Sequence, residues 1–402
     1  MPRRKKELLK GYRKTTPLLI VVFSLLLMGI FAIYNSTIFY SQSIYGSPYR
    51  FMFLHLGWVI VGMVGFFIFY TFHYKTWIRY SSFLFVITLV VLFILSFFGF
   101  FTFQVGLIEC SASRAFVPCI NGAYRWLHIN SAPLPEIPFL GVLSLQPSEL
   151  AKLTTIIFVS ALLSKRISSA KILDKNIFIS FIIPVGLVFV MVLLQPNMST
   201  ATLILLISFA IYFCSGASLK PFYLLVPVIL VLFLVLMLAS PYRRQRFMTL
   251  VMGGDSGNTA LSSGYHTRQV LISLGSGGVF GVGIGQSRQK YQYLPEVASD
   301  SIFAIIGEEL GFFGTVSLVL LYSFLIYQGF NIASSAPDMF SKSVAVGVTS
   351  WMGLQFFVNV ASMVQLIPLT GVPIPLISYG GSSLFFVMCG LGLLANVSKY
   401  CD

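Results

Sequence analysis

The chain has 402 residues, of which 57% are hydrophobic and only 9% are charged, and its formal net charge is +14. A soluble domain needs far more charge to cover its surface, so this composition excludes a soluble fold and requires that most of the chain face lipid. The apolar runs are continuous and about 20 residues long, which suits membrane-spanning helices and excludes the alternating pattern of a membrane β-barrel. The basic residues are dispersed at the ends of these runs, which excludes a nucleic-acid-binding module.

The first fourteen residues contain seven Lys or Arg residues. Because positively charged segments stay in the cytoplasm, they predict a basic cytoplasmic tail over residues 1–16. The apolar run that follows is long and has no evident small-residue cleavage site, so we expect an uncleaved first span. No internal repeat or linker divides the rest, which predicts a single membrane domain over residues 17–402.

The expected fold is an all-α polytopic membrane protein with about ten transmembrane helices and both termini cytoplasmic. A long extracytoplasmic loop is expected over about 104–146. A larger one, over about 241–300, lies between helices 7 and 8 and should contain short helices or re-entrant pieces. The predicted helices cover about 17–39, 52–72, 82–103, 147–164, 177–194, 199–215, 221–240, 301–329, 343–367 and 382–398.

The segment 241–300 carries an unexpected excess of positive charge. It contains six cations and three carboxylates, although the positive-inside rule does not call for cations on the outer side. This excess favours the binding of something anionic, with anionic lipid headgroups as the simpler alternative. The six cations are Arg243, Arg244, Arg246, Arg268, Arg288 and Lys290.

Three carboxylates near the eighth predicted helix are candidates for chemistry or for pairing. Asp300 stands at the start of this helix, where a carboxylate can act as a general base or can cap the helix. Glu308 and Glu309 fall inside the helix, where charge is costly in lipid. We expect both to face the bundle interior, where a basic or amide partner would pair with them.

A second polar group surrounds the start of the fourth predicted helix. Gln146 lies just before the helix, and Glu149 and Lys152 share one of its faces because they are three residues apart. Arg125, in the string NGAYRWLHI at 121–129, is expected on the same side of the membrane. The group is either a salt bridge at a helix start or the polar wall of a substrate groove.

Two stretches rich in Gly or Pro predict close backbone contacts. The run 274–290 contains alternating glycines without a nucleotide-binding context, so these glycines should permit close backbone approach. The run 367–383 predicts a broken or re-entrant segment that lines a cavity. The sequence has no CxxC, Cys/His cluster or HExxH pattern, so no metal ligands are predicted. Cys110 and Cys119 could pair in an oxidising compartment.

Five strings in this order resemble the SEDS family of shape, elongation, division and sporulation proteins: NGAYRWLHI, LQPSELAKL, GYHTRQVLISLGSGGVFGVGIGQSRQKYQYLPE, SDSIFAIIGEELGF and PLTGVPIPLISYGGSS. The resemblance covers nearly the whole chain and favours the FtsW division branch over the RodA elongation branch. It implies a peptidoglycan glycosyltransferase that polymerises lipid II at the outer face of the bacterial cytoplasmic membrane, at the division septum. It also implies a class B penicillin-binding protein and other divisome membrane proteins as partners, with no certain cofactor and a divalent cation left open.

The resemblance also implies roles for particular residues. The essential aspartate of the family falls on Asp300. The family's polar motifs imply substrate binding by Arg125, Gln146, Glu149, Lys152, Arg243, Arg288, Gln289, Lys290, Ser378 and Tyr379. The sequence departs from the family pattern at Asn197, where many members have Asp, and at Ala298-Ser299, where His-Thr is usual. These departures put in doubt a carboxylate at the first position and a histidine at the second.

We expect Asp300 to take the proton from the acceptor's 4-hydroxyl as that oxygen attacks the anomeric carbon, with inversion. Arg125, Lys152, Arg288 and Lys290 are the candidates to bind pyrophosphate. One rival hypothesis is a lipid II flippase without chemistry, which buried glutamates and a broken helix would also suit. Another is a scaffold that activates its penicillin-binding partner.

Overall fold

A computed structural model describes most of the chain. The described residues are 3–103, 116–120, 123–130, 137, 139–169, 175–221, 223, 227, 231, 263–291 and 293–401. Three predictions therefore concern positions outside the described residues: Arg243, Cys110 and most of the helix expected over 221–240.

Helices make up nearly all of the regular structure in the described part of the chain. Most begin and end within a few residues of the predicted positions, because the long apolar runs that define them can satisfy their backbone in lipid only as helices. The helices are α1 (Arg3–Tyr45), α2 (Arg50–Thr71), α3 (Tyr74–Phe103), α4 (Pro147–Ser169), α5 (Lys175–Leu193), α6 (Met198–Cys214), α9 (Ser263–Gly277), α10 (Ile302–Ser334), α11 (Met339–Met363) and α12 (Gly381–Ser398).

Three features differ from the prediction or were not foreseen. α1 begins at Arg3, so the basic residues expected as a tail are already helical, and their cytoplasmic location stays a prediction. α3 begins at Tyr74, inside a segment predicted as a loop, because charged residues end a membrane span without ending the helix. A hairpin of β1 (Leu127–His128) and β2 (Ser144–Leu145) pairs Leu127 with Leu145, and strands this short carry no periodic pattern in the sequence.

Among the described residues, six helices are long and apolar enough to cross a membrane, namely α1, α2, α3, α10, α11 and α12. α5 and α6 are shorter apolar helices. Large apolar side chains on the outside of the bundle, such as Leu27, Ile60 and Phe83, are more than 60% exposed. Such a surface is stable only in contact with lipid. The protein is therefore an all-α membrane protein.

α12 is the central helix of the bundle. In its most apolar stretch of 18 residues, 89% of the residues are buried, compared with 33% in the corresponding stretch of α3. It packs closely against α2 because small residues line their contact. At Gly392, for example, an added Cβ would lie only 2.4 Å from the carbonyl oxygen of Phe66. This close packing gives the outer helices a rigid centre.

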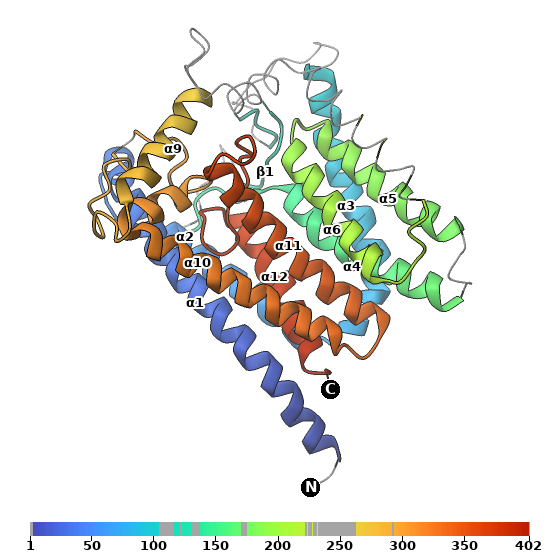
Figure 1. The fold of residues 1–402 in the computed structure, drawn as a ribbon. Coiled ribbons are helices and arrows are strands. Elements are labelled where there is room, and N and C mark those ends of the chain that lie inside the picture. Colours follow the sequence, from blue (N-terminus) through green and yellow to red (C-terminus); the bar gives the residue numbers. More distant parts are fainter. Residues whose placement is uncertain are drawn as a thin grey trace.

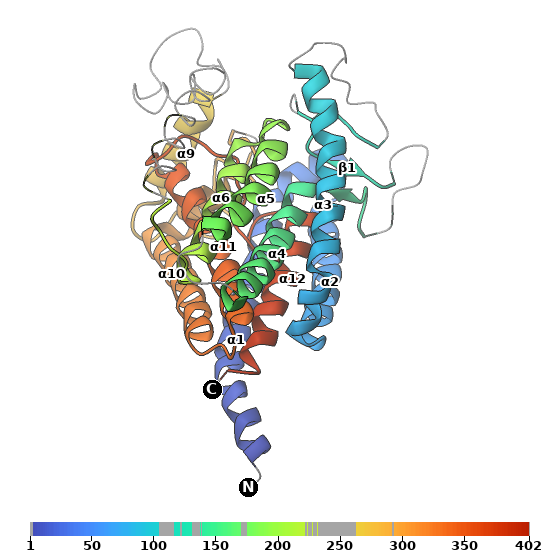
Figure 2. The ribbon, with the colours of Figure 1, turned by 90° about the vertical axis from the view of Figure 1, so that its right-hand side faces the viewer.

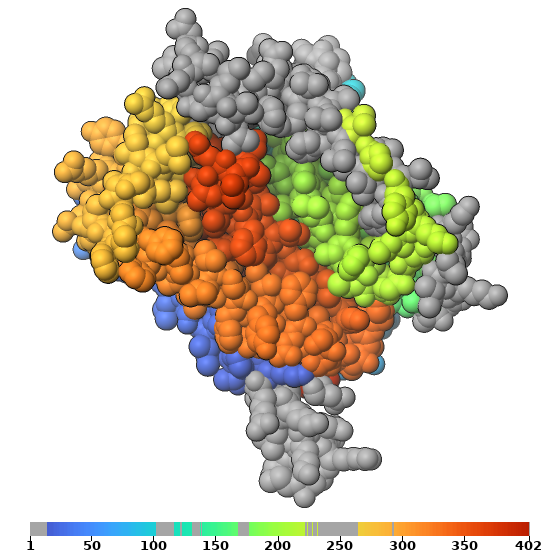
Figure 3. All heavy atoms as spheres, viewed as in Figure 1, coloured from blue at the N-terminus to red at the C-terminus, as the bar shows by residue number. Residues whose placement is uncertain are grey.

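The bundle has two distinct ends (Figures 1 and 2). Both chain termini lie at one end, which we call the terminal end, and the first turns of α1 extend beyond it. The hairpin and α9 lie at the opposite end, which we call the loop end. The segment 364–380 between α11 and α12 also reaches this end, and Figure 3 shows it on the surface beside α9. The described parts of the two segments predicted outside the membrane thus share one end.

Candidate active site

Asp300 lies just before α10, at the loop end. α10 begins at Ile302 and has Ser301 in its N-cap position, without a side-chain capping bond. The alternative that Asp300 caps this helix is therefore wrong. The Asp300 side chain is partly buried. Its Oδ2 faces Gly371, where an added Cβ would lie 3.3 Å away.

A buried amide on α11 holds the main chain of Asp300. Asn359 is fully buried, and its Nδ2 donates hydrogen bonds to the Asp300 carbonyl at 2.9 Å and to the Val372 carbonyl at 2.7 Å. Hydrogen bonds in such a low-dielectric interior are strong and costly to break. Asn359 therefore joins Asp300 to the segment 364–380.

Ser378 and Tyr379 hold the residues that precede Asp300. The Ser378 hydroxyl donates to the Ser299 carbonyl at 2.5 Å, and the Tyr379 N–H donates to the Ala298 carbonyl at 2.8 Å. The positions that depart from the family pattern thus contribute main-chain acceptors. Burial raises the pKa of Tyr379 to about 12, so its hydroxyl stays protonated at neutral pH. These two residues position the loop, and their expected contact with substrate remains a prediction.

The predicted pair of Glu149 and Lys152 is confirmed as a buried salt bridge in the first turns of α4. Lys152 Nζ lies 2.7 Å from Glu149 Oε1, and both side chains are at most 3% exposed. The other carboxylate oxygen accepts a hydrogen bond from Ser383 of α12 at 2.9 Å. Nearby, the Gln146 N–H donates to the Ser382 hydroxyl at 3.3 Å. The start of α4 is thereby joined to the start of α12.

Arg125 is tied to the turn between α5 and α6. Its guanidinium donates to the Gln195 carbonyl at 3.4 Å and also to the Pro196 carbonyl. In the same turn Asn197 caps α6, because its side chain accepts a hydrogen bond from Thr200 N at 3.3 Å. The asparagine that replaces the usual aspartate therefore serves the helix as a cap.

A second buried ion pair joins the glycine-rich segment 274–290 to α1 and α10. Lys290 Nζ donates to Glu309 Oε1 and to Asn35 Oδ1, each at 3.1 Å, and the Asn35 amide donates back to Glu309. Glu308 accepts from the Ser287 hydroxyl at 2.5 Å and from the Arg288 N–H at 3.0 Å. The prediction that both glutamates face the interior is confirmed. Glu309 has the predicted basic and amide partners, whereas Glu308 is bound by serine hydroxyls and a main-chain N–H.

The glycine-rich segment also supplies hydrogen bonds to main-chain carbonyls at a break in α10. Gly311 has φ +65°, which interrupts the helix and leaves carbonyls before it without helical partners. Val282 N and Gly283 N donate to the carbonyls of Glu308 and Glu309 at 2.9 and 3.1 Å. An added Cβ at Gly281 would lie 2.1 Å from the Glu309 carbonyl oxygen. The predicted close approach of glycines is confirmed.

The four cations expected to bind pyrophosphate differ in exposure. Arg288 is exposed and Arg125 is partly exposed. The ammonium groups of Lys152 and Lys290 are buried against glutamates. A direct role of these two lysines in substrate binding remains a prediction, as does that of Gln289, which is buried beside Lys290 with no described hydrogen-bond partner for its Oε1.

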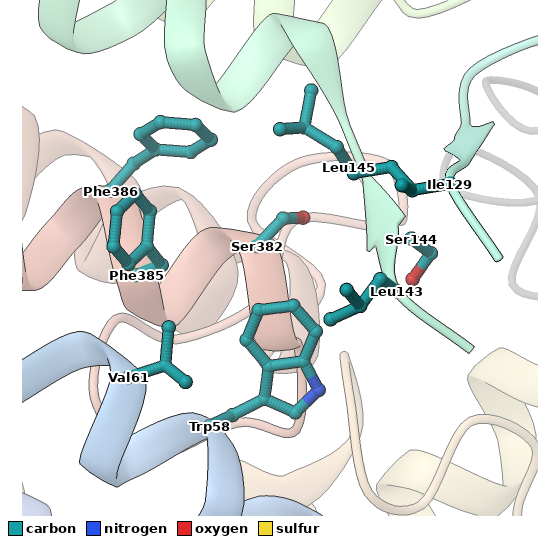
Figure 4. A pocket seen from close by; sticks show the side chains of 9 residues that line it. All are labelled: Trp58, Val61, Ile129, Leu143, Ser144, Leu145, Ser382, Phe385 and Phe386. Carbon is teal, nitrogen blue, oxygen red and sulfur yellow. The ribbon is translucent and has the colours of Figure 1, made fainter. Parts of the chain in front are cut away.

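An apolar cavity of about 170 Å³ lies at the loop end, beside the start of α4 (Figure 4). Aromatic rings of α2 and α12 face the leucines of β2 and its preceding turn across the cavity. Ser382, which bonds Gln146 N, also lines it. The lining residues are Trp58, Val61, Ile129, Leu143, Ser144, Leu145, Ser382, Phe385 and Phe386.

Sequence reasoning missed the buried amides of α11. Asn359 and Gln355 are both fully buried, and their spacing of four in an apolar helix is the signal that could have revealed them, because polar residues in spans seldom face lipid. The described residues contain no group of three or more His, Cys, Asp or Glu residues arranged to hold a metal ion. Cys119 is disulfide-bonded. Its expected partner, Cys110, lies outside the described residues.

Comparisons with known proteins agree with this architecture. Residues 16–402 match the family model FtsW/RodA/SpoVE, described as cell cycle protein. Stage V sporulation protein E of Bacillus subtilis is 34% identical, over 96% of this chain and 98% of its own length. A probable peptidoglycan glycosyltransferase FtsW of Aliivibrio salmonicida is 30% identical, over 95% of this chain and 88% of its own length.

A solved structure described as showing structural coordination of polymerization and crosslinking by a peptidoglycan synthase complex has the same fold. It superposes with a TM-score of 0.70 and 23% identity, over 95% of this chain and 96% of the other. The family model and the sporulation protein each cover nearly the whole chain. The chain therefore belongs to the FtsW/RodA/SpoVE family of cell cycle proteins, the SEDS family that its motifs resemble.

Proposed function

We propose that this protein is a peptidoglycan glycosyltransferase that polymerises lipid II at the outer face of the cytoplasmic membrane during cell division. Relatives that are 30% and 32% identical are named probable peptidoglycan glycosyltransferase FtsW. The observation that carries the proposal is Asp300, a partly buried carboxylate whose main chain is fixed by the buried Asn359. A general base needs this combination of access and fixed position.

In the proposed reaction, an Asp300 oxygen accepts the proton of the acceptor sugar's 4-hydroxyl. That oxygen attacks the anomeric carbon of the donor, the bond from this carbon to the pyrophosphate oxygen breaks, and the configuration inverts. The exposed Arg288 and the partly exposed Arg125 are suited to stabilise the leaving pyrophosphate. The apolar cavity beside the start of α4 is suited to part of a lipid chain, because its lining is almost entirely carbon.

The proposal includes a class B penicillin-binding protein that cross-links the product, together with other divisome proteins at the septum. The solved structure with a TM-score of 0.70 concerns a peptidoglycan synthase complex that couples polymerisation and cross-linking, which supports a partner of this kind. The elongation role of a RodA-type polymerase is the alternative within the family. Arg268 and Arg288, the arginines within 263–301, suit a division polymerase and an elongation polymerase equally.

A flippase without chemistry is the second candidate function. It needs a polar path through the bundle, and the buried charges bear on this need. Glu149 is paired with Lys152, and Glu309 is paired with Lys290. Both pairs serve to join helices or loops near the loop end, which favours an enzyme with a site open at that end.

The test is polymer formation from lipid II by the full-length protein, purified with its penicillin-binding partner and with cross-linking blocked by a β-lactam. Asp300→Asn should reduce the rate by at least about 100-fold, which is the usual contribution of a general base. Glu296→Gln is the matched control, because it removes an exposed carboxylate from the same loop and should keep the rate. The assay with and without Mg²⁺ tests a divalent cation.

Normal polymerisation by Asp300→Asn would refute the assignment of the base. If the wild-type complex moves lipid II across vesicle membranes but makes no polymer, the flippase is the correct function. Polymer that requires the partner's presence, yet is insensitive to Asp300→Asn, would identify this chain as a scaffold.

A further inference from the structure

Three polar side chains form one buried stripe on α11. Trp351, Gln355 and Asn359 are spaced by four residues, which places them on the same face of the helix. All three are fully buried. Burying polar groups in an apolar bundle is unfavourable unless they form hydrogen bonds, so the partners of this stripe indicate what it is for.

Gln355 joins α4 to the segment 364–380. Its Oε1 accepts hydrogen bonds from Lys152 Nζ and from Trp351 Nε1, each at 2.7 Å. Its Nε2 donates to the Pro373 carbonyl at 2.9 Å. One amide thus connects the Glu149–Lys152 ion pair to a main-chain position in the segment that faces Asp300.

Asn359, one helical turn further along, continues this connection. Its Nδ2 holds the carbonyls of Val372 and Asp300 together. Val372 and Pro373 are successive residues, so the two amides grip adjacent peptide groups. The residue before them, Gly371, lies against the Asp300 carboxylate. The contacts therefore run without a gap from the ion pair of α4 to Asp300.

We propose that Gln355 and Asn359 are positioning residues, and that through them the Glu149–Lys152 ion pair sets the position of Asp300. This inference rests on the proposed function, in which Asp300 is the general base. The link is stiff because both amides stand on one turn of a packed helix, with their donors bound to main-chain carbonyls. It gives the buried Lys152 a role in the reaction that does not require contact with substrate.

The link predicts a change in turnover rather than in substrate affinity. A misplacement of a catalytic group by about 1 Å can cost about 100-fold in rate. Asn359→Ala should therefore lower kcat by roughly 10- to 100-fold and change KM by less than about twofold. The assay is lipid II polymerisation by the full-length protein in complex with its partner, with kcat calculated per folded molecule.

The control is Asn396→Ala at the terminal end of α12. Asn396 is also fully buried, and its Nδ2 also donates to two carbonyls, those of Tyr70 and Phe72. Its replacement should lower the Tm by a similar amount and leave kcat unchanged. If Asn359→Ala behaves as Asn396→Ala does, with a lower Tm and a normal kcat, the proposed link is wrong.

A second variant tests the other end of the link and does not depend on whether Asn359→Ala folds. Glu149→Gln combined with Lys152→Met removes both charges, so no unpaired charge stays buried. The link predicts a lower kcat at unchanged KM, and little further loss when Asn359→Ala is added, because both changes break the same connection. A raised KM at normal kcat, or losses that multiply, would overturn it.

The two proposals fail in different ways. If Asp300→Asn polymerises normally, the general base is wrong, whatever Asn359→Ala does. If Asp300→Asn is inactive while Asn359→Ala and the Glu149→Gln/Lys152→Met variant keep their kcat, the base stands and the link is refuted.

Discussion

At each end of the bundle, one buried asparagine donates hydrogen bonds to two main-chain carbonyls. At the terminal end, Asn396 donates to the carbonyls of Tyr70 and Phe72 and accepts from Tyr74 N at 3.0 Å. At the loop end, Asn359 donates to the carbonyls of Asp300 and Val372. Each is a fully buried amide that grips two main-chain acceptors.

The two asparagines differ in which main-chain carbonyls they bind and in whether their side-chain oxygen accepts a hydrogen bond. Asn396 binds the last turn of α2, whose carbonyls have lost their helical partners, and its side-chain oxygen is also bonded. Asn359 binds loop residues next to a carboxylate, and its Oδ1 accepts no hydrogen bond from the described residues. The amide of Asn396 thus joins α2 to α12, whereas the amide of Asn359 joins α11 to the main chain of Asp300 and of the segment 364–380.

Charge is also distributed unequally between the ends. The loop end buries Glu149, Lys152, Lys290, Glu308 and Glu309, whereas Asp338 at the terminal end is partly exposed. A buried charge that loses its partner is strongly destabilising, whereas solvent weakens the interactions of an exposed charge. Substitutions at the loop end should therefore have the larger effects.

The largest effect is expected for Lys290→Met. It leaves Glu309 charged and buried without its ammonium partner, which should lower the free energy of unfolding by about 3–5 kcal/mol. Thermal unfolding in detergent measures the loss, and limited proteolysis within 263–301 shows whether it is local. Adding Glu309→Gln should restore most of the stability, since the unpaired charge is then removed. A Lys290→Met protein as stable as the wild type would show that this pair contributes little.

A smaller effect is expected for Gly371→Ala. Gly371 has φ +68°, and a non-glycine residue in this region costs about 1–2 kcal/mol. The new Cβ would also lie only 3.3 Å from Asp300 Oδ2. The polymerisation rate per folded molecule should therefore fall as well. Gly216→Ala is the matched control, because Gly216 has φ +76° with nothing within 4 Å of an added Cβ. Equal activity in the two variants would argue against a role for the contact between Gly371 and the Asp300 carboxylate.

Local sequence features predicted the parts of this molecule that depend on neighbours in the chain. The apolar runs located the helices, and the three-residue spacing predicted the Glu149–Lys152 pair. The burial of Glu309 was predictable from its place in an apolar helix. Its partners were not, because Asn35 and Lys290 come from distant parts of the chain and only packing brings them together.

The capping alternative for Asp300 failed for a similar reason. Asp300 and Ser301 both suit an N-cap position. In the structure Ser301 takes that position, while the main chain of Asp300 accepts a hydrogen bond from Asn359. Nothing local to residue 300 reveals a donor from residue 359. The site could thus be predicted as a set of residue types, but the links between them could not.

The smallest effect is expected at the terminal end, with a dependence on pH. Asp338 caps α11, accepting from Ser341 N at 2.9 Å and from the Tyr74 hydroxyl at 2.7 Å. Burial alone would raise the pKa of Asp338, but these hydrogen bonds and the charge of Lys75 outweigh it and hold the pKa below the ordinary value of 3.8. Because the folded state binds this proton less readily than the unfolded chain, the stabilisation is present above pH 3.8 and is lost as the pH falls through the lower, folded pKa.

Asp338→Asn should therefore lower the Tm slightly at pH 7, by an amount that corresponds to about 1 kcal/mol or less, since asparagine is also a good cap. The difference in Tm from wild type should shrink as the pH is lowered below 3.8, because the wild-type carboxylate then loses its charge as well. Polymerisation at pH 7 should stay normal, since this end of the bundle only holds helices together. A Tm difference that is the same at pH 7 and pH 3 would mean that the charge of Asp338 contributes nothing, and a loss of turnover would mean that the two ends are coupled.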